Sequence, residues 1–238
     1  MSLKAAARIS VAFCLALALA GCGSNNSAGP AKSPTTSTPA TKPADLAALN
    51  KIVLTAADLP SGWKGTPYKE DPSDSAGQAA LLKCVGARDT DPDKVAEANS
   101  DDFDLGDASI SSSATSYRSQ SDLDVDVALL HSPKLAGCYE RLIKTQVASA
   151  LPAGAKITSV PFKITFGSAG GPANVIATAE STVNVTVQGQ QVRIYLTVAF
   201  ITGPLIEAEV DAENVGSPVP AALVKSLYTK VATRAAMS

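Results

Sequence analysis

The sequence contains few of the side chains from which catalytic and metal sites are usually built. Its 238 residues include a single histidine, His131, and four cysteines with no Cys-x-x-Cys pair among them. No Gly-x-Ser-x-Gly turn is present to carry a nucleophilic serine. These absences argue against a metal site and against a Ser-His-Asp hydrolase. We therefore expect no metal, no cofactor and no catalytic residue, and the chain is predicted not to be an enzyme.

The chain also lacks an excess of positive charge. Lys and Arg number 20 against 22 Asp and Glu, which gives a formal net charge of −2. Proteins that bind nucleic acid through phosphate contacts ordinarily carry a basic surface, so we expect no nucleic-acid partner. With 45% hydrophobic residues and a mean hydropathy of +0.12, the chain is too apolar to be disordered as a whole.

The apolar run near the N-terminus, residues 9–20, is too short to cross a bilayer, which takes about 20 residues. It follows the basic residues Lys4 and Arg8 and ends in small side chains. A basic start, a short apolar middle and small residues at the cleavage point are typical of a secretory signal peptide.

The end of this run carries a more specific motif. The sequence Leu19-Ala20-Gly21-Cys22 resembles the lipobox of bacterial lipoproteins. The resemblance implies that residues 1–21 are a lipoprotein signal peptide and that the sulfur of Cys22 receives a diacylglycerol. Two acyl chains are enough for stable anchoring. We therefore expect the cell membrane to be a partner, through a diacylglyceryl anchor on Cys22. The alternative is an ordinary signal peptide in which Cys22 has no such role.

Residues 22–44 contain no large apolar side chain after the cysteine, and they are rich in Ser, Thr and Pro. Such a segment cannot bury enough surface to offset the entropy lost on ordering. Its prolines favour an extended polyproline II conformation. We predict a disordered stalk that holds the following domain clear of the membrane. Both an O-glycosylated stalk and an unmodified spacer are consistent with this composition.

Two cysteines, Cys84 and Cys138, lie outside the leader and the lipobox. An even pair in an exported domain predicts a disulfide. Two buried free thiols, or half of a metal site, are the alternatives.

The remaining residues, 45–238, predict a single extracytoplasmic domain that begins with short, mostly helical elements. A capped turn is expected at residues 55–58, and Gly86 is expected to end a helix. Residues 121–130 fit either a strand or a helix, and we favour two consecutive helices there, the second opening at Ser132-Pro133. The other expected elements are helices at 45–53, 76–85 and 91–98 and a strand at 109–118.

From residue 155 onward the hydrophobic pattern has a period of two. Four β segments at 157–166, 174–187, 192–201 and 205–210 are separated by short glycine-containing turns, and a final helix follows within 218–237. Short gaps between strands indicate an antiparallel meander. The fold class is thus predicted as α+β, with an antiparallel meander of four to five strands, helices packed on one face and one disulfide.

This order of elements, with the runs Leu54-Thr-Ala-Ala-Asp-Leu-Pro-Ser-Gly-Trp63 and Ser132-Pro-Lys-Leu-Ala-Gly-Cys138, resembles the extracytoplasmic α+β lipoproteins of actinobacteria. These include domains similar to the extracellular sensor of a mycobacterial serine/threonine kinase. The resemblance implies a ligand-binding or sensory role in the cell envelope. It transfers no ligand-contact residue, so the ligand-binding residues are not assigned.

Several candidate chemical groups have simpler structural interpretations. His131 is expected at a helix end, where a cation complements the helix dipole. The acidic segments 89–93 and 122–126 lack the Gly and Glu positions of a calcium loop, which favours solvated acids and helix caps. For the acids at 101–104, a calcium site assembled across the fold stays an open alternative. The glycine-rich turn 167–171 lacks the lysine and helix of a phosphate loop. Trp63 is expected either to fill the core or to line a pocket.

Together these patterns predict a lipid-anchored domain on the extracytoplasmic side of the cell membrane. Its role is expected to be ligand binding or sensing, with a small molecule, a lipid or another envelope component as the ligand. A cavity lined by aliphatic side chains between the sheet and the helices would favour a lipid ligand. The alternative is a structural or accessory lipoprotein that docks an envelope protein partner. A cell-envelope hydrolase is the least favoured hypothesis.

Overall fold

The computed structural model describes residues 42–238 except for 71, 152–153 and 169. The expected signal peptide, the lipidation site Cys22 and all but the last three residues of the expected stalk lie outside the described residues. Within the described part, no helix combines the length and the apolar character needed to cross a membrane.

The centre of the domain is a nine-stranded antiparallel sheet in the described part of the chain. Its strands follow the order β1-β3-β4-β9-β8-β7-β5, while β2 pairs with β4 and β6 pairs with β7. The strands are β1 (Lys64–Thr66), β2 (Lys94–Asn99), β3 (Asp102–Leu105), β4 (Ala108–Tyr117), β5 (Lys156–Ser159), β6 (Phe162–Phe166), β7 (Val175–Val187), β8 (Gln190–Gly203) and β9 (Ile206–Val215).

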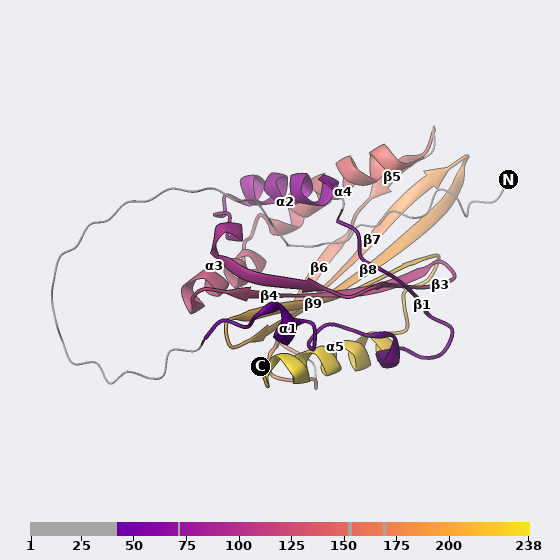
Figure 1. Cartoon of the computed structure of the whole chain (residues 1–238). Coiled ribbons are helices and arrows are strands. Elements are labelled where there is room, and N and C mark those ends of the chain that lie inside the picture. The colour runs from indigo at the N-terminus through magenta and orange to yellow at the C-terminus, as the bar shows by residue number, and fades with distance from the viewer. Residues whose placement is uncertain (1–41, 71, 152–153, 169) are drawn as a thin grey trace, which may run out of the picture.

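Helices cover both faces of this sheet (Figure 1). The two helices α1 (Leu46–Leu49) and α5 (Ala221–Ala235) lie below the sheet in this view, and the other three lie on the opposite side. Those three are α2 (Pro72–Val85), α3 (Gln120–Leu130) and α4 (Leu135–Ala150). The α+β class, the antiparallel sheet and the disulfide are confirmed, with more strands than predicted.

The expectation that helices pack on one face is wrong. The reason lies in β8, which carries apolar side chains on both of its faces. Ala199 and Ile201 join the core cluster that contains α5. Val198 and Phe200 join the cluster that contains α2, α3 and α4. A strand that is apolar on both sides needs two covering layers.

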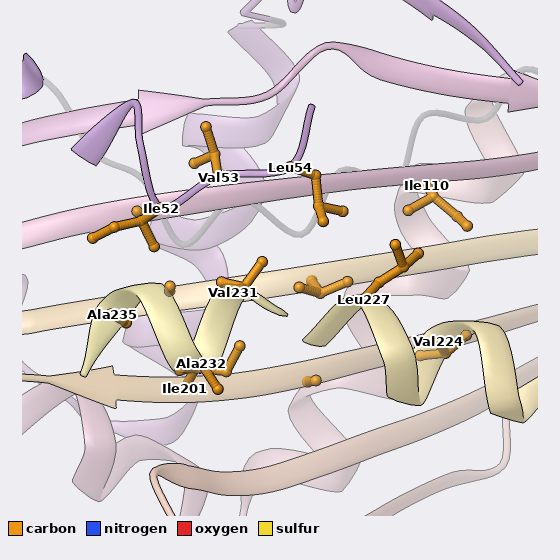
Figure 2. Close-up of a cluster of buried hydrophobic side chains, with 14 of the residues drawn as sticks. Ile52, Val53, Leu54, Ile110, Ile201, Val224, Leu227, Val231, Ala232 and Ala235 are labelled. Atoms are coloured by element: carbon orange, nitrogen blue, oxygen red, sulfur yellow. The ribbon is translucent and has the colours of Figure 1, made fainter. Parts of the chain in front are cut away.

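The core below the sheet is built around α5. Val224, Leu227, Val231 and Ala235 form the buried stripe of the helix, and they meet the apolar segment that follows α1 and the strands β4 and β8 (Figure 2). The approach is close, because a Cβ atom added to Gly203 would lie 2.4 Å from the carbonyl oxygen of Ala235. This position in β8 therefore requires glycine.

Ion pairing also holds α5 in place. Arg234 donates two hydrogen bonds to Asp58, at 2.6 and 3.0 Å, and a third to the carbonyl of Val53 at 3.0 Å. Burial acts to raise the pKa of Asp58, but the hydrogen bonds and charge of Arg234, together with Thr55, outweigh it and lower that pKa. Thr55 and Asp58 form the capping box that the sequence predicts.

Some local predictions are wrong. Residues 91–98 do not form a helix: Asp91–Asp93 make one 3-10 turn, and β2 then pairs with β4. Residues 157–166 form two strands, β5 and β6, interrupted near Pro161, which has no N–H to donate to the ladder. The favoured helix at 121–130 is confirmed as α3, and α2 ends before Gly86, whose φ is +80°.

Candidate functional site

A pocket lies between the sheet and the helices α2, α3 and α4. Its cavity volume is about 20 Å³, which is room for about one water molecule. Ligand pockets in proteins are typically a few hundred Å³ and mostly apolar, so this cavity has the apolar character of a ligand site but must widen to admit a ligand. Its lining residues are Leu81, Leu129, Leu130, Leu135, Tyr139, Phe162, Ile164, Ala179, Ser181, Leu196, Val198 and Phe200.

The floor of the pocket follows from strand periodicity. Leu196, Val198 and Phe200 occupy alternate positions of β8 and so share one face. Ala179 and Ser181 do the same on β7, where they pair with Val198 and Leu196. The sequence predicts this apolar face of β8. The sequence does not predict that the small side chains of Ala179 and Ser181, on the paired strand β7, leave space beside this face.

The roof of the pocket is held together by the disulfide. Cys84 of α2 bonds to Cys138 of α4 with an S–S distance of 2.05 Å, which confirms the predicted pairing. Each cysteine lies three residues after a pocket-lining leucine, Leu81 in α2 and Leu135 in α4. Residues three apart share a helix face, so the crosslink fixes the two leucines relative to each other.

Two polar groups lie within the pocket lining. Tyr139 is buried and packs against Phe162, with ring centroids 4.4 Å apart. Burial raises the pKa of the Tyr139 hydroxyl, although a hydrogen bond with Ser181 acts in the opposite direction. The hydroxyl therefore stays protonated at neutral pH and can donate a hydrogen bond inside an otherwise apolar site.

A row of four carboxyl groups lies on β9, the strand next to the pocket floor, and none of the four residues is among those that line the pocket. Glu207, Glu209, Asp211 and Glu213 alternate along β9 with residues of the opposite core, so all four project to the pocket side of the sheet. We refer to these four residues as the acidic row. Three of them pair directly with pocket-floor residues of β8, as Glu209 with Phe200, Asp211 with Val198 and Glu213 with Leu196.

The acidic row is poorly solvated. Glu209 is 3% exposed, and neither of its carboxyl oxygens has a hydrogen-bond partner in the described part of the chain. Burial raises the pKa of Asp211 and of Glu213 to about 8, and neighbouring acids add to the effect. It raises the pKa of Glu209 well above its usual range. At neutral pH these groups therefore hold their protons in the absence of a cation.

At the closed end of the row, Glu207 belongs to a buried cluster with α3. The hydroxyl of Tyr117 donates to Asp126 and also lies 3.1 Å from an oxygen of Glu207. One hydroxyl proton cannot serve both carboxyl groups. Burial, with the nearby charge of Asp126, raises the pKa of Glu207 to about 8, so a protonated Glu207 supplies the second proton. Thr90 completes the cluster by donating to Asp126 at 2.8 Å.

The candidate residues that the sequence singles out lie elsewhere. His131 is exposed at the C-terminal end of α3, as predicted, and stacks on Phe166 with ring centroids 4.2 Å apart. Trp63 packs against the core cluster around α5 and does not line the pocket. The glycine-rich turn joins β6 to β7.

The acidic segments have structural roles. Asp93 and Asp122 both pair with Arg88, and Asp91 pairs with Lys94 at 3.2 Å. Residues 102–105 form β3, whose Phe103 is in the core. Over the described residues, no group of three or more metal-ligating side chains comes together.

Sequence reasoning missed the acidic row, although its signal is present. Acids at 207, 209, 211 and 213 alternate with apolar residues, the pattern of a strand with one solvated face. That interpretation fails because α3 and α4 cover part of this face, and no local pattern reports such a distant contact.

Comparison with known proteins finds little. No model of a protein family matches the chain, and no curated protein matches it. One solved structure is weakly similar, the extracellular domain of PknH from Mycobacterium tuberculosis. Its TM-score is 0.45 at 10% sequence identity, covering 83% of this chain and 99% of that one. The expected resemblance is thus confirmed only as a weak structural similarity.

Proposed function

We propose that the chain is a lipid-anchored, extracytoplasmic domain that binds or senses an apolar ligand in the pocket between the sheet and α2–α4. The observation that carries this proposal is the apolar lining of the pocket, whose side chains must move apart to admit a ligand larger than one water molecule. Twelve residues from α2, α3, α4, β6, β7 and β8 line the pocket, and ten of them have aliphatic or aromatic hydrocarbon side chains. Most ligand sites combine such a lining with a few polar groups that fix orientation, the role of Tyr139 and Ser181 here.

The extracytoplasmic location rests on two features. The disulfide between Cys84 and Cys138 is of a kind that persists in oxidising compartments. The leader pattern at residues 1–21, followed by Cys22, supports export and lipid anchoring.

Intact mass analysis of the mature protein tests the anchor. We expect a polypeptide that starts at Cys22 and carries a diacylglyceryl group, and we expect Cys22→Ala to abolish this product. An unmodified Cys22 in the exported protein would contradict the anchor while leaving the pocket untouched.

The pocket is tested by ligand titration. All three core clusters lie within residues 42–238, so the chain from residue 23 onward contains the whole fold and avoids competition from the protein's own lipid. We expect this chain to bind decanol, observed by calorimetry. Ala179→Leu fills the pocket and should abolish binding.

The matched control is Thr178→Leu, which adds a side chain of the same kind on the opposite face of β7. Far-ultraviolet and near-ultraviolet circular dichroism show whether each variant is folded. Equal decanol affinity in the native chain and in a folded Ala179→Leu variant would overturn the pocket assignment.

A surface aromatic pair favours the second candidate, an accessory lipoprotein that docks a protein partner. Phe166 is 49% exposed and stacks on His131, which is exposed as well, so the pair is accessible at the surface. In-cell crosslinking through this pair should then recover one protein partner, and Phe166→Ser should lose it. Unchanged crosslinks in Phe166→Ser would contradict the docking role.

A further inference from the structure

The helices that cover the cavity differ in how they are held. Cys84 of α2 and Cys138 of α4 are joined by the disulfide, so these two helices keep their relative position. The helix α3 contains no cysteine, and it contributes Leu129 and Leu130 to the lining. It lies at one end of this layer, beside β4 (Figure 1). Of the three helices, α3 is therefore the one that can leave the lining without disturbing the crosslinked pair.

A buried polar cluster joins the middle of α3 to the sheet. Asp126 of α3 is 3% exposed and accepts hydrogen bonds from Thr90, at 2.8 Å, and from the hydroxyl of Tyr117 in β4. The same tyrosine hydroxyl lies 3.1 Å from an oxygen of Glu207 in β9. The carboxyl groups of Asp126 and Glu207 also contact each other through a hydrogen bond. The docking of α3 thus brings two carboxyl groups together out of reach of solvent.

This cluster is stable only while it holds enough protons. The hydroxyl protons of Thr90 and Tyr117 both go to Asp126. Glu207 therefore needs a proton of its own, which it can donate within the cluster. If Glu207 lost that proton, two negative charges would face each other in a buried site, which is costly.

One cation acts on Glu207, and other acids share it. Lys94 of β2 attracts the charge of Glu207. Its ammonium group also lies 3.2 Å from Asp91 and 3.3 Å from Glu97. The attraction of Lys94 is therefore divided among three acids and cannot offset a second charge in the cluster.

The remaining groups that face Glu207 add no positive charge. On β9 itself, Glu209 is buried on the same face and its pKa is raised in part by the charge of Glu207. The residues paired with Glu207 on the two neighbouring strands are Thr115 of β4 and Thr202 of β8, which are uncharged. Ionisation of Glu207 would therefore act mainly against Asp126, the charged group that α3 brings to the cluster.

We propose that α3 is the lid of the pocket, and that loss of the proton shared by Glu207 and Asp126 releases it from the sheet. This assignment rests on the proposed function of the pocket. Release relieves the repulsion because water can then solvate both carboxylates. Leu129 and Leu130 leave the lining together with the helix, so the cavity widens enough to admit an apolar ligand.

The lid opens toward alkaline pH. Burial, with the charge of Asp126, raises the pKa of Glu207 to about 8 in the docked state, whereas a solvated glutamate has a pKa of about 4.3. The docked state therefore keeps a proton that the released state loses. Release becomes easier by up to about tenfold per pH unit until the docked group also ionises near pH 8. Asp91, whose pKa is raised to about 6, is already ionised at pH 7.

Hydrogen exchange of the chain from residue 23 onward, followed by mass spectrometry at pH 7 and pH 9, tests the lid. After correction for the intrinsic exchange rate, we expect the opening equilibrium of α3 to increase about tenfold, and that of α5 to change less. Glu207→Gln keeps a hydrogen-bond donor in the cluster at both pH values and should abolish the increase. The matched control is Asp124→Asn, which removes an exposed carboxyl group from the same helix and should keep the increase.

Decanol, which is uncharged at both pH values, links the lid to the pocket. A ligand that binds only the open state gains affinity in proportion to the open fraction, so calorimetry should show about tenfold tighter binding at pH 9 than at pH 7. In Glu207→Gln the affinity should be the same at both pH values.

Three results would overturn the lid. Exchange in α3 that does not respond to pH in the native chain is the first, and a response of unchanged size in a folded Glu207→Gln variant is the second. The third is decanol affinity that is equal at both pH values in the native chain, and all three leave the apolar pocket in place. Failure of decanol to bind at either pH, in a chain whose α3 does open, would overturn the proposed function and the lid with it.

Discussion

Glu209 lies in the middle of a strand whose neighbouring residues fix its orientation. Ala208 and Val210 are buried in the core cluster around α5. Because side chains alternate along a strand, these two contacts force Glu209 to the pocket side of the sheet. Its orientation is thus fixed by the packing of its neighbours and not by any hydrogen-bond partner of its own.

Replacing this carboxyl group with an amide tests its protonation. Between the unfolded pKa of about 4.3 and the raised folded pKa, folding takes up a proton, so the carboxyl group costs more stability as the pH rises. Glu209→Gln should therefore raise the unfolding free energy by about 1–2 kcal/mol at pH 8.5 and by little at pH 5.5. Urea unfolding at both pH values measures this difference.

The control is Glu180→Gln, which removes an exposed carboxyl group from the opposite face of β7 and should change the unfolding free energy at neither pH. If Glu209→Gln destabilised the domain more at pH 8.5 than at pH 5.5, the carboxyl group would have to be ionised and paired.

Predictability at the residue scale depends on whether the relevant signal is local. Cys84 and Cys138 could be paired from composition alone, and His131 could be placed at a helix end from its neighbours. Glu209 could not be recognised as buried, because what covers it comes from helices about 60 to 90 residues earlier in the chain. Its own alternating pattern indicates a solvated face.

Among the elements, α5 depends on a close approach to β8 at one position. Gly203→Ala would place a Cβ atom 2.4 Å from the Ala235 carbonyl oxygen, so either the helix or the strand must move. We expect a loss of about 1–3 kcal/mol in unfolding free energy, measured by urea unfolding at neutral pH.

The control for this substitution is Gly137→Ala in α4, where an added Cβ meets nothing within 4 Å. Alanine is the better helix former, so this change should be neutral or stabilising by up to about 1 kcal/mol. Equal effects of the two substitutions would contradict the close contact between α5 and β8.

The second prediction at this scale concerns α2 and α4. Their disulfide closes a loop with a sequence separation of 54 residues, which in the chain-entropy model contributes about 4 kcal/mol. The double variant Cys84→Ser, Cys138→Ser should lose up to that amount and should increase amide hydrogen exchange in α2. The native protein treated with reductant is the matched comparison. Unchanged exchange in α2 would show that packing alone holds the roof of the pocket.

Elements built from local pattern were predicted better than elements built from pairing. Residues 121–130 form a helix, and the capping box at 55–58 is present, since both depend on neighbours in sequence. The short strands β1 and β3 were missed, and β2 was assigned as a helix. Strand propensity is set largely by the partner strand, and β2 pairs with β4, which begins nine residues after β2 ends.

For the molecule as a whole, the buried acids predict an unusual pH dependence. Burial raises the pKa values of Glu207, Asp211 and Glu213 to about 8, and that of Asp91 to about 6. The folded state therefore binds more protons than the unfolded state over this range, so stability falls as the pH rises. We expect the unfolding free energy to be higher at pH 5.5 than at pH 8.5 by about 1 kcal/mol or more.

Urea denaturation at half-unit steps between pH 5.5 and pH 8.5 provides the measurement. The variant with Glu207→Gln, Asp211→Asn and Glu213→Gln should flatten the profile. Among the described carboxyl groups with a shifted pKa, Asp58 alone acts in the opposite sense, and the stability that it contributes is lost as the pH falls below about 4. A stability that increases toward pH 8.5 would contradict the raised pKa values.

The overall class could be predicted, but the layering could not. Period-two patterning after residue 155 indicates the antiparallel sheet, and the separate helical segments indicate α+β. The period-two pattern of β8 predicts one apolar face, which carries Val198 and Phe200. Ala199 and Ile201 make the other face apolar as well. Missing this second face hid the division of the helices into two layers, with α1 and α5 on one side of the sheet and α2, α3 and α4 on the other.

The central claim is that the pocket between the sheet and α2–α4 holds an apolar ligand in the cell. Native mass spectrometry of the protein purified from the cell envelope without added lipid tests this claim most directly. The account predicts a noncovalent mass increment on the native protein that is absent from a folded Ala179→Leu variant purified in parallel. A native protein free of any increment, or an increment of the same mass on both proteins, would contradict it.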